Sequence, residues 1–182
     1  MTRILPAQAP YAADIESMLA ELTPPGMTPL VLFRTLARSP RVFKKFRAGA
    51  LLDKGPLSLR HRELVILRTC ALAGNEYEWG VHVTFFGSRA EFTEEQLAAT
   101  VHGAGHWDAP EAALLTAAEQ LHDTTRLDDD AWAALRAHFD EPQVLEVLAV
   151  AGFYRTVSLF VNALQLPLES YAARFPARPP SA

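Results

Sequence analysis

The sequence predicts an all-α protein, a multi-helix bundle of about eight or nine helices. Apolar residues recur at the three- and four-residue spacing of helices, and no segment shows sustained alternation of apolar and polar residues. Neither an Asn-Gly nor an Asp-Gly pair, the strongest hairpin signal, occurs in the chain. Because 182 residues with 49% hydrophobic content can bury one sizeable core, we expect a single domain over residues 1–182.

Three helices are expected in the first third of the chain. Pro10–Leu22 is amphipathic and ends at Thr23–Gly26, where proline and glycine oppose continuation. Pro29–Ala37 is the second helix. Ser39–Pro40 then offers a cap and a proline at the first helical position, and we expect this third helix to stop near Gly55.

The stretch from Leu57 to Gly87 predicts two helices in tandem. Ser58 can cap the first helix, and Gly74 closes it. Asn75, with Glu78 three residues later, resembles a capping box for the second helix, which we expect to end at Gly87.

Four further helices follow. Thr93 with Gln96 and Asp108 with Glu111 form capping boxes, and Phe92 with Leu97 can form a hydrophobic staple. The next helix starts at Asp128–Asp130 and holds Trp132, and the last is capped by Asp140–Gln143 and ended by Pro167.

The final helix is apolar nearly all round. This predicts either the central helix of the bundle or, in part, an oligomer interface. Glu146, Arg155, Asn162 and Gln165 interrupt its apolar run, so a buried helix is favoured over a membrane span. We expect the tail over residues 176–182 to be disordered.

Composition excludes several classes of protein. A formal net charge of -4, with no Lys/Arg block, argues against nucleic acid as a partner. The single cysteine, Cys70, excludes an intramolecular disulfide, a CxxC redox centre and a cysteine-based zinc site. The N-terminal residues lack the apolar region of a signal peptide, so we expect a cytoplasmic protein with no membrane partner.

Two ionisable residues stand on apolar helical stripes. Glu63 shares a face with Leu59, Ile66 and Leu67, and His82 lies among Trp79, Phe85 and Phe86. Burying either group is costly unless it is paired, which makes a functional pocket worth proposing.

Each of these two residues has a functional and a structural interpretation. Glu63 suits a general acid or base, or else forms a buried salt bridge to Arg68, Arg155 or another arginine. His82 suits proton transfer, or else is a core histidine bonded to the backbone or to Glu78.

Other side chains near this pair have competing roles. Glu78, four residues before His82, can orient it, act as acid or base itself, or cap the helix. Glu63, Glu78 and His82 together allow a metal site, but the second half-motif of a di-iron bundle is missing, so we expect no metal. Tyr77 can donate a hydrogen bond, and Arg155 can receive an anionic substrate from the last helix.

The segment RELVILRTCALAGNEYEWGVHV, residues 62–83, resembles the core motif of the carboxymuconolactone decarboxylase family, which includes the alkylhydroperoxidase D proteins. AEQLHD and VLAVAGFYRTVSLFVNALQLPLE resemble downstream segments of its non-peroxidatic branch, so the resemblance covers a core of about residues 30–169. Peroxidatic members carry two cysteines at the positions of Asn75 and Glu78. Without those thiolates, dithiol hydroperoxide reduction is disfavoured.

The resemblance implies a cofactor-independent carboxy-lyase acting on a small carboxylated lactone or related organic acid. Glu63 and His82 match the family's glutamate and histidine, and Glu78 is the third catalytic candidate. The substrate-binding candidates are Tyr77, Asn75, Trp79 and Arg155. It implies a homo-oligomer, dimer-based, trimeric or hexameric. The alternative is a non-catalytic, oligomeric bundle that binds a small molecule.

Overall fold

A computed structural model describes residues 2–103 and 105–177. Within these ranges the chain forms nine α-helices and one π-helix and no strand, as the all-α prediction requires. In chain order the helices are α1 (Ala13–Glu21), α2 (Val31–Leu36), α3 (Pro40–Arg47), α4 (Leu59–Leu72), α5 (Glu76–His82), η1 (Val83–Gly87), α6 (Glu94–His102), α7 (Ala109–Thr124), α8 (Asp129–His138) and α9 (Glu141–Leu164).

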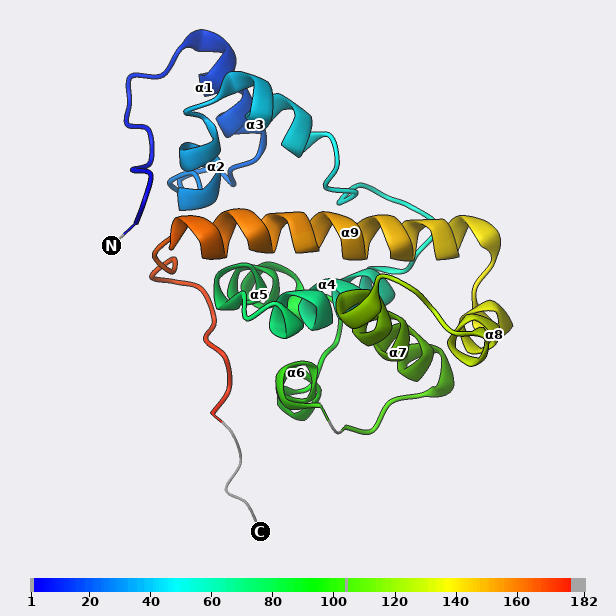
Figure 1. Cartoon of the computed structure of the whole chain (residues 1–182). Coiled ribbons are helices and arrows are strands. Elements are labelled where there is room, and N and C mark those ends of the chain that lie inside the picture. Colours follow the sequence, from blue (N-terminus) through cyan, green and yellow to red (C-terminus); the bar gives the residue numbers. More distant parts are fainter. Residues whose placement is uncertain (1, 104, 178–182) are drawn as a thin grey trace.

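The long helix α9 separates two groups of helices (Figure 1). Helices α1–α3 lie along one side of it, and α4–α7 lie along the other. Phe46 of α3 packs on Phe153 and Phe160 of α9, with ring centroids 4.9 and 5.8 Å apart. Helix α4 is the centre of the second group, because it contacts α5, α6, α7 and α9. Both groups share one contiguous apolar core.

Helix α9 is the one described helix that is long and apolar enough to cross a membrane by length and composition alone. In the fold it is the central helix that the sequence predicts, because it packs against α4, α5, α7 and α8. Its outer face nevertheless leaves Leu145 and Leu159 about two-thirds exposed, at 66% and 65%.

The predicted helix starts agree closely with the structure. Capping boxes form at Thr93, Asp108 and Asp140, and the Ser58 and Asp128 side chains each accept a hydrogen bond from a backbone N–H in the first turn. These starts depend on residues within one turn of each other, so local sequence is sufficient to define them.

The third helix departs from the prediction in two ways. The Ser39 side chain makes no capping hydrogen bond, although Pro40 does occupy the first position. The helix also ends at Arg47 instead of near Gly55. The segment after it is irregular, and two of its carbonyls, those of Leu51 and Asp53, accept hydrogen bonds from Nη1 of Arg62.

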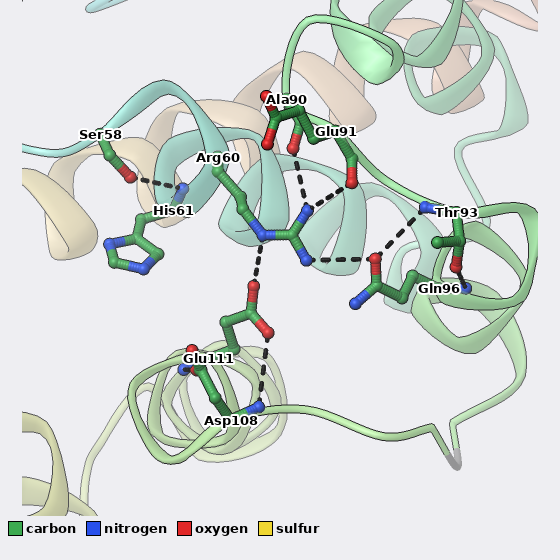
Figure 2. Close-up of polar contacts among 9 residues, drawn as sticks. All are labelled: Ser58, Arg60, His61, Ala90, Glu91, Thr93, Gln96, Asp108 and Glu111. Atoms are coloured by element: carbon green, nitrogen blue, oxygen red, sulfur yellow. Dashed lines mark hydrogen bonds and ion pairs between the residues drawn. The ribbon is translucent and has the colours of Figure 1, made fainter.

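A network around Arg60 joins the start of α4 to the segment before α6 and to the first turns of α6 and α7 (Figure 2). The Nε atom of Arg60 lies 2.5 Å from a Glu111 carboxylate oxygen, while Nη1 donates to the carbonyls of Ala90 and Glu91. Its Nη2 atom donates to the Gln96 side chain, which also completes the α6 capping box. One guanidinium thereby fixes the position of three chain segments around α4.

Residues 178–182, most of the tail for which we predict disorder, lie outside the described part of the chain.

Candidate active site

Glu63 and His82 meet between helices α4 and α5. An oxygen of Glu63, Oε2, lies 2.6 Å from Nδ1 of His82. Both residues are almost completely buried, at 1% and 3% exposed. Since a carboxylate can only accept, Nδ1 donates this bond, and Nε2 is the nitrogen left to face other groups.

The second oxygen of Glu63 is paired with the neighbouring residue. Oε1 lies 3.4 Å from Nε and 3.3 Å from Nη2 of Arg62, which is itself buried. Arg62 is therefore the arginine that balances the buried carboxylate. The two arginines named by the sequence argument pair elsewhere: Arg68 with Glu119, and Arg155 with the carbonyl of His122.

Glu78 completes the site from the first turn of α5. Its Oε1 atom lies 3.4 Å from Nε2 of His82. The capping role belongs to Asn75, whose Oδ1 accepts from the backbone N–H of Glu78. The Glu78 side chain turns instead toward His82, and its Oε2 atom is buried without a hydrogen-bond partner in the described structure. Glu78 thus contributes its backbone to the helix and its carboxyl group to the site.

The two carboxylates set the protonation of His82. Burial by itself lowers the pKa of the imidazole, but the charges and hydrogen bonds of Glu63 and Glu78 outweigh it and raise that pKa to about 9. At neutral pH His82 is therefore an imidazolium, which holds a proton on Nε2 beside Glu78. The arrangement is that of a charged general acid.

His82 and Glu78 line a cavity of about 310 Å³. Most of its wall is apolar and comes from the α1–α2 connection, from α5 with η1, and from the C-terminal segment. Arg89 is the only arginine or lysine in that wall. The full lining consists of Leu22, Thr23, Pro24, Met27, Thr28, Leu30, Phe33, Leu52, Glu78, Val81, His82, Phe85, Phe86, Arg89 and Tyr171.

The π-helix η1 follows His82 directly and shapes the cavity wall. A π-helical turn is wider than an α-helical one and is frequent at functional sites. It carries Phe85 and Phe86 into the wall, and the Phe86 ring lies 5.3 Å from the His82 ring. On the other side of His82, the Tyr154 ring of α9 packs edge-on at 4.9 Å.

The four predicted substrate-binding residues do not line this cavity. Asn75 donates to Ser158, and Trp79 donates its indole N–H to Thr100. The Tyr77 hydroxyl donates to Glu169 and accepts from the backbone of Leu32. Arg155 lies at two shallow depressions beside His122. Each side chain is thus engaged in a structural contact outside the cavity.

Several cavity residues were missed by the sequence argument. Arg89 gave no sequence signal, because the π-helix η1 and the turn after it break the α-helical spacing between Arg89 and His82. Tyr171 and the segment around Leu22–Phe33 gave none, because only the tertiary fold brings them to α5.

Cys70 is completely buried, and burial raises the pKa of its thiol well above the usual value. Because Asn75 and Glu78 occupy the motif's cysteine positions, no dithiol can form there. In the described part of the chain, no group of three His, Cys, Asp or Glu side chains is arranged to hold a metal ion.

Comparison with known proteins finds one matching family model. The family model described as "Carboxymuconolactone decarboxylase family" matches residues 37–123, which include the whole Glu63–His82 site. This match and the fold support the carboxymuconolactone decarboxylase and AhpD-like superfamily for the chain. No curated protein matches it.

Solved structures share the fold of this chain at low sequence identity. A peroxidase-related protein with an alkylhydroperoxidase AhpD core from Ralstonia eutropha has a TM-score of 0.72 and 17% identity, covering 91% of this chain and 90% of its own. A peroxidase-related protein from Silicibacter has a TM-score of 0.71 and 18% identity, covering 96% of both chains. The debrominase Bmp8, as a variant bound to 2,3,4-tribromopyrrole, has a TM-score of 0.75 and 16% identity, covering 93% of both. At these identities the likeness establishes the AhpD-like fold.

Proposed function

We propose that the protein is a cofactor-independent carboxy-lyase that acts on a small carboxylated lactone or related organic acid. The observation that carries this proposal is the Glu63–His82–Glu78 chain, which opens on an apolar cavity. A buried imidazolium beside a cavity of this size can deliver a proton to a bound organic molecule. The superfamily supports the reaction type, and Bmp8 supports a ring-sized ligand in this fold.

The reaction needs no electron carrier. The bond between the carboxylate carbon and the ring breaks, CO₂ leaves, and the electron pair delocalises into the lactone carbonyl as an enolate. His82 then gives its Nε2 proton to the ring carbon and becomes neutral, and it recovers a proton from water. Glu63 fixes the orientation of the His82 imidazole ring through Nδ1, and it stabilises the imidazolium before the proton is transferred.

Glu78 has a different part in this scheme. Its Oε1 atom is close enough to Nε2 to orient the acidic proton between turnovers. Its unpartnered Oε2 atom can accept a hydrogen bond from the substrate. An apolar wall around these groups strengthens their electrostatic effect on the developing enolate.

The test is CO₂ release from 4-carboxymuconolactone by wild type, His82→Asn and Glu63→Gln. We expect each substitution to lower kcat by at least about 100-fold, because each removes the proton donor or its partner. His138→Asn, at an exposed histidine, is the matched control and should retain full activity. Circular dichroism and size-exclusion chromatography should show unchanged helicity and assembly.

Full activity in both site variants would overturn the assignment of this pair. If the wild type bound lactone acids in the cavity but released no CO₂ from any of them, the alternative of a non-catalytic binding bundle would replace the enzyme.

A further inference from the structure

We propose that Arg89 binds a carboxylate which the substrate keeps through the reaction, so that the site selects a ring with an anionic side arm. This inference rests on the proposed function in one respect, that the substrate occupies the cavity lined by His82. It adds the residue that orients the substrate and the chemical class of the group bound there.

Arg89 is available for a ligand in a way that most arginines of this protein are not. Its guanidinium makes no hydrogen bond or ion pair with any described residue, and its one aromatic contact is with the Phe86 ring, 5.6 Å away. In contrast, the guanidinium groups of Arg60, Arg62 and Arg68 are all bonded to carboxylates and carbonyls. An unpaired guanidinium at the wall of an apolar cavity is suited to bidentate binding of a carboxylate.

The residue proposed to hold the substrate, Arg89, is separate from the residue proposed to protonate it, His82. His82 ends α5 and Arg89 lies beyond η1, in the turn after Gly87, and both residues line the same cavity. Phe85 and Phe86 lie between them in the cavity wall. A ligand that touches both ends therefore needs an apolar ring near His82 and a carboxylate on a short side arm.

The Glu78 carboxylate determines the orientation of such a ligand in the cavity. Its buried Oε2 atom has no donor in the described structure, and a carboxylate ligand cannot supply one. The leaving carboxylate is repelled by Glu78 but loses its charge as CO₂, whereas a carboxylate that the substrate keeps is more favourable at the Arg89 end. The carboxylate at Arg89 stays in the product, because the carboxylate that leaves must adjoin the carbon protonated by His82.

Isothermal titration calorimetry with 3-phenylpropionate and its neutral amide, 3-phenylpropanamide, tests this directly. We expect wild type to bind the acid about tenfold or more tightly than the amide, the usual effect of a charge-assisted hydrogen bond. Arg89→Gln should bind both equally and weakly, and Arg89→Lys should recover part of the preference. Arg41→Gln is the matched control, because Arg41 is exposed beside a different apolar depression that includes Phe46.

Three results would overturn the inference: no measurable binding of the acid by wild type, equal affinity for acid and amide in wild type, or an unchanged preference in Arg89→Gln. Arg89 is exposed, so its variant should fold, and thermal unfolding checks this. Both probes lack a leaving carboxylate and do not react. Arg89-dependent binding without turnover of lactone acids would therefore overturn only the proposed function, and turnover with Arg89-independent binding would overturn only this inference.

Discussion

At the scale of single residues, the charge of His82 is the property on which the proposed chemistry depends. Three ionisable side chains stand in a row, with Glu63 on Nδ1 and Glu78 beside Nε2, and Arg62 balances the far side of Glu63. Burial opposes the imidazolium, and the two carboxylates more than compensate for it. The same interactions that prepare an acid for catalysis therefore also stabilise the folded protein.

Because the charge of His82 stabilises the fold, we predict that the free energy of unfolding falls as pH rises. The pKa of His82 is about 9 in the folded protein and about 6.5 in the unfolded chain, so its stabilisation is fully present below about pH 6.5 and is lost as pH rises through about 9. The loss should reach up to about 3 kcal/mol. Urea unfolding across this pH range measures the loss. Glu63→Gln removes the main partner of His82 and should flatten the dependence of the free energy of unfolding on pH.

Exposed His138 supplies the control, since His138→Gln should leave the pH dependence of unfolding as it is in wild type. A wild-type free energy of unfolding that does not decline toward pH 9 would contradict the assigned protonation of His82.

The residues of the site differ in how well sequence could predict them. Glu63 and His82 were recognisable because an ionisable group on an apolar stripe needs a partner, and each proves to be the other's partner. Arg62 was not recognised as the balancing cation, because adjacent helical residues do not normally face each other. It reaches Glu63 while its other nitrogen is held by carbonyls of the irregular segment before α4.

At the scale of elements, the helix starts could be predicted and the cavity could not. A capping box such as Asp108 with Glu111 is decided within four residues. The cavity joins the α1–α2 connection, helix α5 with η1, and Tyr171 near the C-terminus. These segments are brought together by packing on α9 and α5, for which one sequence gives no pairing signal.

The Arg60 network permits a prediction about how elements hold together (Figure 2). Arg60→Leu leaves the buried Glu111 carboxylate and the Ala90 carbonyl without their donor, which should destabilise the protein by about 3 kcal/mol. Urea unfolding measures the change. Glu21→Ala breaks the pair with Arg47, in which the two side chains are 54% and 36% exposed, and should cost less than about 1 kcal/mol.

Equal effects of these two substitutions would contradict the view that Arg60 holds the segment before α6 and the first turn of α7 against α4.

At the scale of the whole molecule, the outer face of α9 exposes two large apolar side chains. Leu145 and Leu159 are 66% and 65% exposed, and midway between them a side chain at Gly152 would meet no atom within 4 Å. Seven-residue spacing places all three on one face. We propose that this face is the interface of a homo-oligomer, because a second copy of α9 could pack closely at Gly152.

Light scattering coupled to size-exclusion chromatography tests this proposal. We expect wild type to elute as an oligomer, and the double substitution Leu145→Ser with Leu159→Ser to shift it toward the protomer mass, because both side chains would lose their buried partner surface. Leu5→Ser, at an equally exposed leucine, should leave the mass unchanged. A monomeric wild type would overturn the proposed interface.

The C-terminal segment is hydrogen-bonded to α2 and α5 beside the cavity. Glu169 accepts hydrogen bonds from the backbone of Val31 and from Tyr77, and Tyr171 forms part of the cavity wall two residues later. The cavity therefore exists only when the first and last parts of the chain are both folded. Any molecule that fills it binds the native state alone, and by thermodynamic linkage it must raise the unfolding temperature in proportion to the logarithm of its concentration. Thermal stability thus provides a reaction-independent way to identify the natural ligand from a library of organic acids.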